Sequence, residues 1–327
     1  MDVALLFGMI IGMLFIGAPI AVSLGLSSII FLLLFSDASL ASVAQSMYQA
    51  MAGHYTLLAI PFFVLASSFM STGGVAKRII RFAIAIVGHL PGGLAIAGVF
   101  ACMLFAALSG SSPATVVAIG SIVIAGMRQV GYSKDFAAGV IANAGTLGIL
   151  IPPSVNLLIY GSLAETSIGQ LFVAGIVPGL VLVALFMLWI LVSNWNDTST
   201  QAEDVPLSVK LSASKALIPP FVIFLVVMGS IYLGIATPTE SAALGVVTAL
   251  VIVGFDGHFS RDFFNRCFVQ TARTTGMVLL IVMAAFILNV TLSLTGVAQT
   301  TTNWVTSLGL SATQLLLVLI VFYILLG

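Results

Sequence analysis

Long apolar runs recur along the chain, and glycine and proline residues interrupt several of them. A run of about 18 or more apolar residues is typical of a helix that spans a membrane. The apolar runs lie at 3–35, 56–72, 92–127, 136–163, 168–195, 216–235, 238–254, 276–293 and 313–326. Only 6% of the residues are charged and 61% are hydrophobic, whereas about a quarter of the residues in soluble domains are charged. We therefore predict an all-α polytopic membrane protein with the lipid bilayer as its solvent.

The charged residues restrict the path of the chain through the membrane. Lys and Arg number 10, Asp and Glu also number 10, and this zero net charge argues against a nucleic-acid partner. The basic residues form four clusters, which are Lys77, Arg78 and Arg81; Arg128 and Lys134; Lys210 and Lys215; and Arg261, Arg266 and Arg273. Positive charge marks the cytoplasmic side, and a simple path keeps all four clusters inside only if 92–127 enters and leaves on one side. We therefore predict a re-entrant hairpin over 92–127.

A first polar break, Ser109–Thr115, lies near the middle of the predicted hairpin. Irregular backbone at membrane depth is tolerated only where protein buries it or where it lines a cavity. The carbonyl and hydroxyl oxygens of such a tip can replace the hydration shell of a small cation. Pro113 suits the first turn of the second arm, whose free N–H groups would favour an anion at the tip. Close helix packing through small residues is the alternative explanation.

A second break, Asn143–Asn156, contains the adjacent residues Pro152 and Pro153. Two prolines remove two N–H donors and disfavour a helical conformation at Ile151, so we predict a discontinuous helix with unpaired carbonyls. Carbonyls at the end of a broken helix suit a cation, and N–H groups of the restarted helix near Ser154 suit a carboxylate. A hinge with incidental polar residues is the alternative explanation.

Ionisable residues are missing from the middle of the predicted spans. Proton-driven carriers usually keep an ionisable relay there, so coupling to Na+ through uncharged oxygens fits the sequence better than coupling to protons. Glu240 follows Thr237, Pro238 and Thr239. We expect Glu240 to cap the helix that begins at Pro238 rather than to bind substrate.

The two breaks together define the candidate site. We expect Na+ to be bound by oxygens of Ser109, Gly110, Ser112, Asn143, Gly145, Thr146, Gly148 and Pro152. We expect the substrate to be bound by Ser111, Ser112, Pro113, Thr115, Ser154 and Asn156. An intramembrane serine hydrolase with its nucleophile in Gly110-x-Ser112 is an alternative from another class. A nucleophilic serine needs a base within reach, and no His or Lys lies at that depth, so we do not expect an enzyme.

The motifs resemble those of the large membrane subunit, the DctM type, of tripartite ATP-independent periplasmic (TRAP) transporters. The resemblance extends over about 1–310. Its motifs are Pro61-Phe62-Phe63, Gly73-Gly74-Val75-Ala76-Lys77-Arg78, Pro91-Gly92-Gly93, Ser109-Gly110-Ser111-Ser112-Pro113-Ala114-Thr115, Gly131-Tyr132, Gly145-Thr146-Leu147-Gly148-Ile149-Leu150-Ile151-Pro152-Pro153-Ser154, Gly175-Ile176-Val177-Pro178-Gly179 and Ala236-Thr237-Pro238-Thr239-Glu240.

The resemblance implies a multi-pass secondary transporter of the bacterial inner membrane. Such transporters import organic anions, such as C4-dicarboxylates or sialic acid, and use a sodium gradient. The resemblance further implies two partners, a periplasmic substrate-binding protein and a small membrane subunit of the DctQ type. It also implies an ion-transporter-like elevator fold with inverted repeats, in which Ser109–Thr115 is the tip of the first hairpin and Asn143–Asn156 is the broken helix beside it.

The resemblance divides the chain into four regions. We expect a scaffold with amphipathic arm helices over 1–90, the first hairpin and broken helix over 91–165, and scaffold spans with a polar loop at 194–215 over 166–275. Region 276–327 is expected to start a second repeat. The family repeats the hairpin and broken helix in its C-terminal half, and no second pair precedes Gly327. We therefore expect a truncated chain, or, if this form is natural, a non-transporting assembly subunit.

Overall fold

A computed structural model describes residues 2–35, 39–72, 74–195, 205–255, 257 and 259–326. All regular structure within these residues is helical, which confirms the predicted all-α class. Residues 196–204 of the predicted polar loop lie outside the described residues. The chain divides into two compact units, one formed by 54–276 and the other by 1–53 together with 277–327.

In the unit of 1–53 and 277–327, the apolar run 3–35 forms two helices. Gly17 adopts a left-handed φ of 86° and Pro19 follows it, so the first helix ends and a second one begins. The helices of this unit are α1 (Asp2–Phe15), α2 (Ile20–Phe35), α3 (Leu40–Gly53), the later part of α15 (Arg261–Leu294), α16 (Val297–Ser307) and α17 (Ala312–Leu326). One buried apolar cluster consists of Leu6, Ile10 and Phe31, with Leu24, Leu288 and Leu292 packed against it.

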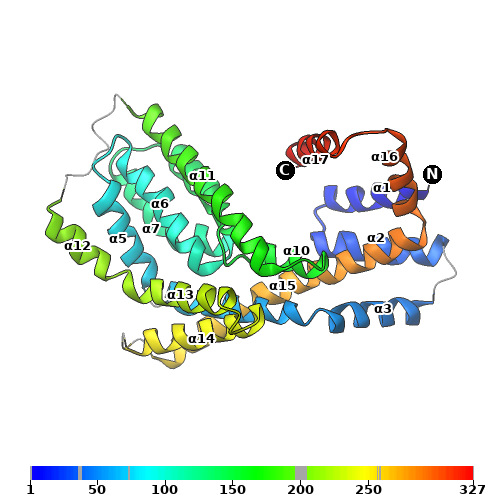
Figure 1. Ribbon diagram of the computed structural model, residues 1–327, viewed down its shortest axis with the longest axis horizontal. Helices are drawn as coiled ribbons and strands as arrows, with labels where there is room; N and C mark the ends of the chain where they lie inside the picture. Colours follow the sequence, from blue (N-terminus) through cyan, green and yellow to red (C-terminus); the bar gives the residue numbers. More distant parts are fainter. Residues whose placement is uncertain are drawn as a thin grey trace. The chain divides into compact units, whose positions relative to one another are not determined.

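The unit of 54–276 contains both predicted breaks, and α6 (Gly93–Ser109) is its central helix. Helix α6 packs against α5, α7, α8, α9 and α11, and Figure 1 shows α7 and α11 beside it. Its buried positions include Ala95, Ala97, Gly98 and Ala101, small residues that let membrane helices approach closely. The other helices of this unit are η1 (Tyr55–Leu58), α4 (Ala59–Thr72), α5 (Val75–Val87), α7 (Ser112–Gln129), α8 (Lys134–Gly145), α9 (Leu147–Leu150), α10 (Val155–Leu163), α11 (Ile168–Ser193), α12 (Leu207–Lys215), α13 (Ile218–Tyr232), α14 (Pro238–Phe255) and the first part of α15.

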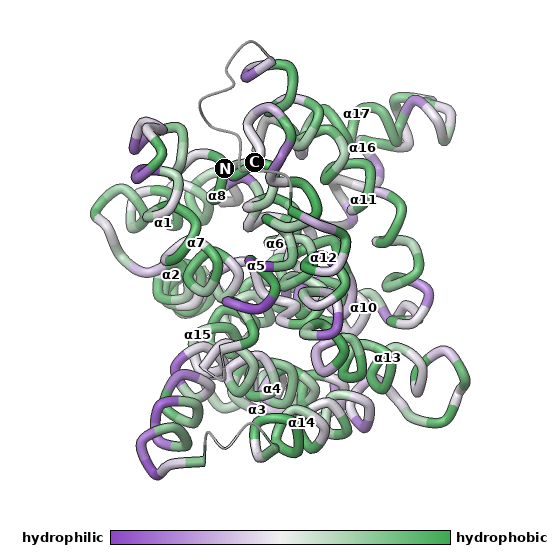
Figure 2. The backbone as a smooth tube through the Cα atoms, turned by 90° about the vertical axis from the view of Figure 1, so that its left-hand side faces the viewer, coloured by the Kyte–Doolittle hydropathy of each residue, from purple (hydrophilic) through white to green (hydrophobic). Residues whose placement is uncertain are grey.

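Several helices are suited to cross a membrane by their length and composition. Within the described ranges, four helices meet this condition, or up to six if each bent pair counts as one span. The bent pairs are 134–150 with 155–163 and 207–215 with 218–232. Figure 2 shows that α11 and α13 are hydrophobic along most of their length. These spans bear out the predicted polytopic membrane protein.

Helix α14 begins with a reciprocal cap. The Glu240 carboxylate accepts hydrogen bonds from the Thr237 N–H and the Thr237 hydroxyl, both at 2.8 Å. The Glu240 N–H in turn donates to Thr237 Oγ1 at 3.3 Å. This arrangement is a capping box, which pairs N–H groups that an uncapped helix start would leave free. The prediction that Glu240 caps this helix is therefore confirmed.

Candidate functional site

The first break separates α6 from α7 at Gly110 and Ser111. Gly110 has a left-handed φ of 59°, and its N–H still donates to the Ala106 carbonyl at 2.9 Å. Helix α7 begins at Ser112 with Pro113 in its first turn, as the sequence predicts, and packs against α6. The tip is therefore a short turn between two helices that lie side by side.

The second break separates α8, α9 and α10. Helix α8 ends at Gly145, the short α9 ends at Leu150, and α10 begins at Val155. The helical direction changes by 41° across the break at Pro152 and Pro153. The predicted discontinuous helix is therefore confirmed.

Ser154 secures the restarted helix. Its hydroxyl donates to the Ile149 carbonyl at 2.6 Å and accepts from the Leu157 N–H at 3.4 Å. The same side chain therefore satisfies a carbonyl that precedes the break and an N–H group that follows it. This role explains a small hydroxyl residue at position 154 without any ligand.

The two breaks meet through backbone atoms. The Val155 N–H donates to the Gly110 carbonyl at 3.1 Å, which joins the restarted helix to the hairpin tip. A Cβ atom added at Gly110 would lie 2.4 Å from the Pro153 carbonyl oxygen, and one added at Gly148 would lie 2.8 Å from the Ser111 carbonyl carbon and from the Ser112 nitrogen. Glycine is needed at both positions because a side chain would collide with main-chain atoms that cannot rotate away.

The hydroxyl groups of the tip form a small network. Ser109 Oγ and Thr115 Oγ1 are 3.0 Å apart, and Thr115 Oγ1 donates to the Ser111 carbonyl at 2.9 Å. The Ser112 hydroxyl is buried, and no partner for it is found among the described residues. A buried polar atom without a partner costs about 1–3 kcal/mol, so Ser112 Oγ is available to a ligand at this junction.

Other predicted site residues lie at the surface of this unit. Asn143, Thr146 and Asn156 are exposed. The Asn143 amide donates to the Gly139 carbonyl at 2.9 Å, and the Thr146 hydroxyl donates to the Asn143 carbonyl at 2.7 Å, so both bonds stay within their own segment. Asn143 lines a separate cavity of about 230 Å³ with residues of α6, α8 and α11. The structure thus brings 109–115 together with 148–155 and leaves Asn143 at a different cavity.

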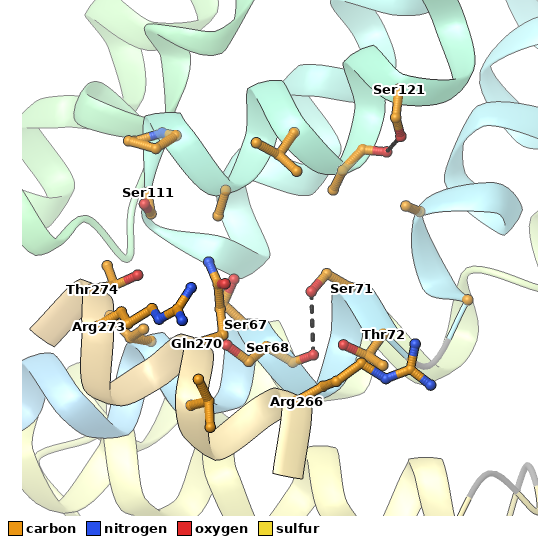
Figure 3. A pocket seen from close by; sticks show the side chains of 18 of the residues that line it. Ser67, Ser68, Ser71, Thr72, Ser111, Ser121, Arg266, Gln270, Arg273 and Thr274 are labelled. Atoms are coloured by element: carbon orange, nitrogen blue, oxygen red, sulfur yellow. Dashed lines mark hydrogen bonds between the residues drawn. The ribbon is translucent and has the colours of Figure 1, made fainter. Parts of the chain in front are cut away.

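A larger cavity, of about 860 Å³, lies between α4, α5, α7 and α15. Ser111 and Pro113 of the hairpin tip form part of its wall, as two of the residues predicted to bind substrate. Figure 3 shows hydroxyl and amide groups from α4 and α15 around it. Its polar lining residues are Ser67, Ser68, Ser71 and Thr72 of α4, Lys77 of α5, Ser111 and Ser121, and Asn265, Arg266, Gln270, Arg273 and Thr274 of α15.

The cavity is positively charged. Lys77, Arg266 and Arg273 line it, and no acidic residue is found among its described lining residues. Arg266 forms an ion pair with Asp262, four residues earlier on α15, and both side chains are mostly exposed. Figure 3 places the Arg273 guanidinium below Ser111 and next to Gln270. Guanidinium and hydroxyl groups are donors that suit a carboxylate, so this cavity can bind an organic anion.

The basic residues of α15 are functional candidates that the sequence reading missed. The charge rule accounts for them only as markers of the cytoplasmic side. Arg266, Gln270, Arg273 and Thr274 recur at the spacing that places residues on one face of a helix, and all four line the cavity. A polar stripe with this spacing, next to a long apolar run, is the signal that could have found them.

Comparison with known proteins adds independent evidence. The sequence matches the family described as "Tripartite ATP-independent periplasmic transporter, DctM component" over residues 7–327. It is 59% identical over 255 residues to the C4-dicarboxylate TRAP transporter large permease protein DctM of Vibrio cholerae, with 78% of this chain and 56% of the relative covered. It is 44% identical over 308 residues to the protein of the same name from Pseudomonas aeruginosa, with 93% and 71% covered. It is 35% identical over 278 residues to the sialic acid TRAP transporter large permease protein SiaM of Vibrio cholerae, with 84% and 64% covered.

The chain spans a little more than half the length of the first of these relatives. These relatives are permease subunits of transporters and not enzymes, which decides against the intramembrane hydrolase. The family match covers almost all of the chain and includes both breaks of the structure. The chain therefore belongs to the family of DctM components, the large permease subunits of tripartite ATP-independent periplasmic transporters.

Proposed function

We propose that this chain forms part of a transporter that imports an organic anion across the bacterial inner membrane together with Na+. The observation that carries the proposal is the positively charged cavity bordered by α4, α5, α15 and the hairpin tip. Three cations line this one cavity, and their charged N–H donors suit an anionic ligand. Ser111 and Pro113 connect this cavity to the junction of the two breaks.

The substrate is expected to be a carboxylate. Two of the relatives are named for C4-dicarboxylates and one for sialic acid. Arg273 can bind one carboxylate with two parallel N–H donors, and the nearby hydroxyls of Ser111 and Thr274 can complete its hydrogen bonds. Arg273 is accordingly the residue on which we expect binding to depend most.

Na+ is expected to bind beside the anion, at the junction of the tip and the broken helix. Ser112 Oγ is a buried oxygen there that has no partner among the described residues, and the ends of α8 and α9 supply carbonyl oxygens. The described residues contain no group of three or more His, Cys, Asp and Glu side chains that could hold a metal ion. Uncharged oxygens are therefore the ligands that we propose for Na+.

The remaining parts of the proposal follow from family membership. The chain is expected to work with a periplasmic substrate-binding protein and a small membrane subunit. The tip and the broken helix are expected to move against the scaffold in an elevator movement. The backbone contact between the two breaks supports this movement, because it lets them move as one body.

Uptake of radiolabelled succinate into proteoliposomes tests the proposal, with the small membrane subunit and the periplasmic binding protein supplied. Uptake should require an inward sodium gradient, and Arg273→Gln should abolish it. Arg261→Gln is the matched control, because Arg261 lies on the same helix and does not line the cavity. Uptake that persists without sodium would contradict the coupling, and uptake that persists in Arg273→Gln would contradict the location of the anion site.

A further inference from the structure

The cavity of about 230 Å³ that Asn143 lines is a groove between α8 and α11. Both helices pack against α6, and Val99 of α6 and Ile190 of α11 line the groove while they are only 1% and 3% exposed. Trp189, which also lines it, is 71% exposed. The α8–α11 groove therefore has a buried floor and opens to the surface of this unit at Trp189.

The wall of the α8–α11 groove is largely apolar. Phe136 of α8 and Phe186 and Trp189 of α11 contribute aromatic rings. Asn143 is the polar exception among the described lining residues, and its amide already donates to the Gly139 carbonyl at 2.9 Å. An apolar cavity excludes water and accepts apolar ligands, so this groove suits a hydrocarbon chain rather than a polar solute.

The surroundings of the groove identify the source of that hydrocarbon. Helix α11 is long and apolar enough to span a membrane, and only 22% of its most apolar stretch is buried within this structure. Leu185 and Leu188, next to the groove residues on α11, are exposed. In a bilayer such side chains face lipid. Acyl chains of the bilayer therefore reach the rim of the groove.

The groove starts at the level of a membrane surface. Phe136 lies in the first turn of α8, which begins at Lys134, and Trp189 lies about one turn before the end of α11 at Ser193. Tryptophan is enriched at the interface between membrane and water, where spans end. From Phe136 the groove continues along α8 to Asn143, roughly 10 Å further into the span. This direction is that of an acyl chain entering from its headgroup.

Basic side chains lie at the same end. Lys134 starts α8, Arg128 lies in the last turn of α7, and α7 packs against α8. Both side chains are exposed, as is that of Asp135, so the charge at this end is positive by one unit. A positive charge at the membrane surface attracts the phosphate of an anionic lipid.

We propose that the α8–α11 groove is a binding site for a phospholipid with an anionic headgroup. One acyl chain lies in the groove against Val99 and Phe186, and the phosphate lies beside Lys134 and Arg128. The lipid contacts α8, the first segment of the broken helix, and supports its packing against α6 and α11. This site is distinct from the positively charged cavity, so the inference does not rest on the proposed substrate.

Tryptophan fluorescence tests the inference, because bromine on an acyl chain quenches a tryptophan that it contacts. The chain contains three tryptophans, and the double substitution Trp195→Phe with Trp304→Phe leaves Trp189 at the groove. The full chain with these substitutions is reconstituted into phosphatidylcholine vesicles that contain an increasing fraction of brominated phosphatidylglycerol. Quenching should saturate at a low fraction of this lipid. Brominated phosphatidylcholine should instead quench in proportion to its fraction.

Two substitutions in this background locate the site. Gly139→Leu should abolish the saturation, because Gly139 lines the groove and a Cβ atom there meets nothing within 4 Å, which leaves the leucine free to fill the groove. Gly229→Leu is the matched control, since its Cβ position is equally open but it lies on α13, outside the groove, and it should keep the saturation. Lys134→Gln should raise the lipid fraction for half-maximal quenching about fivefold, and Lys134→Arg should not.

The following results would overturn the inference without affecting the proposed function. Saturation that persists in Gly139→Leu would place the lipid outside the groove. Quenching in proportion to the fraction of phosphatidylglycerol would show contact with bulk lipid alone, and no quenching by either lipid would show that a second copy of the chain or another protein covers the groove. If Gly139→Leu fails to fold, the exposed residue Lys134 decides, because an unchanged half-maximal fraction in Lys134→Gln would exclude the headgroup site.

Discussion

Replacement of Gly148 by alanine tests the contact between the two breaks. The new Cβ atom would lie 2.8 Å from two main-chain atoms of Ser111 and Ser112, which cannot rotate out of its way. Overpacking of this kind costs about 1–3 kcal/mol, and contact with backbone places the cost near the upper end. Alanine is better than glycine in a helix by about 1 kcal/mol, so the net loss of stability should be about 2 kcal/mol.

Gly139→Ala provides the matched control. Gly139 lies in the preceding helix α8, and a Cβ atom there would have no neighbour within 4 Å. This variant should therefore gain about 1 kcal/mol from helix propensity alone. The two alanine substitutions should thus change the stability in opposite directions.

Thermal unfolding of the purified chain in detergent measures the difference. At about 1.5 °C per kcal/mol for a chain of 327 residues, the unfolding temperature should fall by roughly 3 °C in Gly148→Ala and rise slightly in Gly139→Ala. Because the clash would push the tip away from the broken helix, Gly148→Ala should also weaken sodium binding. An equal rise in unfolding temperature for both variants would show that the tip does not approach the break closely, and it would refute the site.

Three further substitutions test separate parts of the structure. Ser112→Ala should leave the sodium-free protein as stable or more stable, because it removes a buried hydroxyl that has no partner among the described residues. The rise in unfolding temperature on adding sodium should be smaller in this variant. A rise equal to that of the unmutated chain would exclude Ser112 as a ligand. Asp262→Asn should strengthen succinate binding a few-fold because it frees Arg266 from its ion pair, and the effect should be larger at low salt than at high salt. Calorimetric titration measures the affinity. An unchanged affinity would indicate that Arg266 does not face the anion. Glu240→Ala should lower the unfolding temperature through loss of the cap on α14 without altering succinate binding, and weaker binding would contradict its purely structural role.

The interruptions of the helices could be predicted from sequence because they have local causes. Gly17 and Pro19 end α1, Pro152 and Pro153 separate α9 from α10, and Gly110 turns the chain between α6 and α7. Proline lacks an N–H donor and glycine adopts a left-handed φ readily, whatever the rest of the chain does. The same local chemistry predicted the cap formed by Glu240.

The cavity could not be predicted, because it forms between segments that are distant in sequence. Ser67 of α4, Lys77 of α5, Ser111 of the tip and Arg273 of α15 come together only when the helices pack. The charge rule accounts for Lys77 and Arg273 as markers of the cytoplasmic side, and the polar stripe of α15 does not indicate which helices it faces. Asn143 is predicted as a ligand from its place in the second break, and the structure shows that its amide N–H donates to the preceding turn of its own helix.

The junction between Gly110, Gly148 and Val155 is built from main-chain atoms, which all amino acids share. Its shape is therefore insensitive to which acid is carried, whereas the facing walls of α4 and α15 consist of side chains that can be exchanged one at a time. Preference for a different substrate can then arise by point substitution on those two helices, without any change in the junction that is proposed to bind Na+. Related permeases can in this way differ in substrate specificity while they keep the same backbone junction.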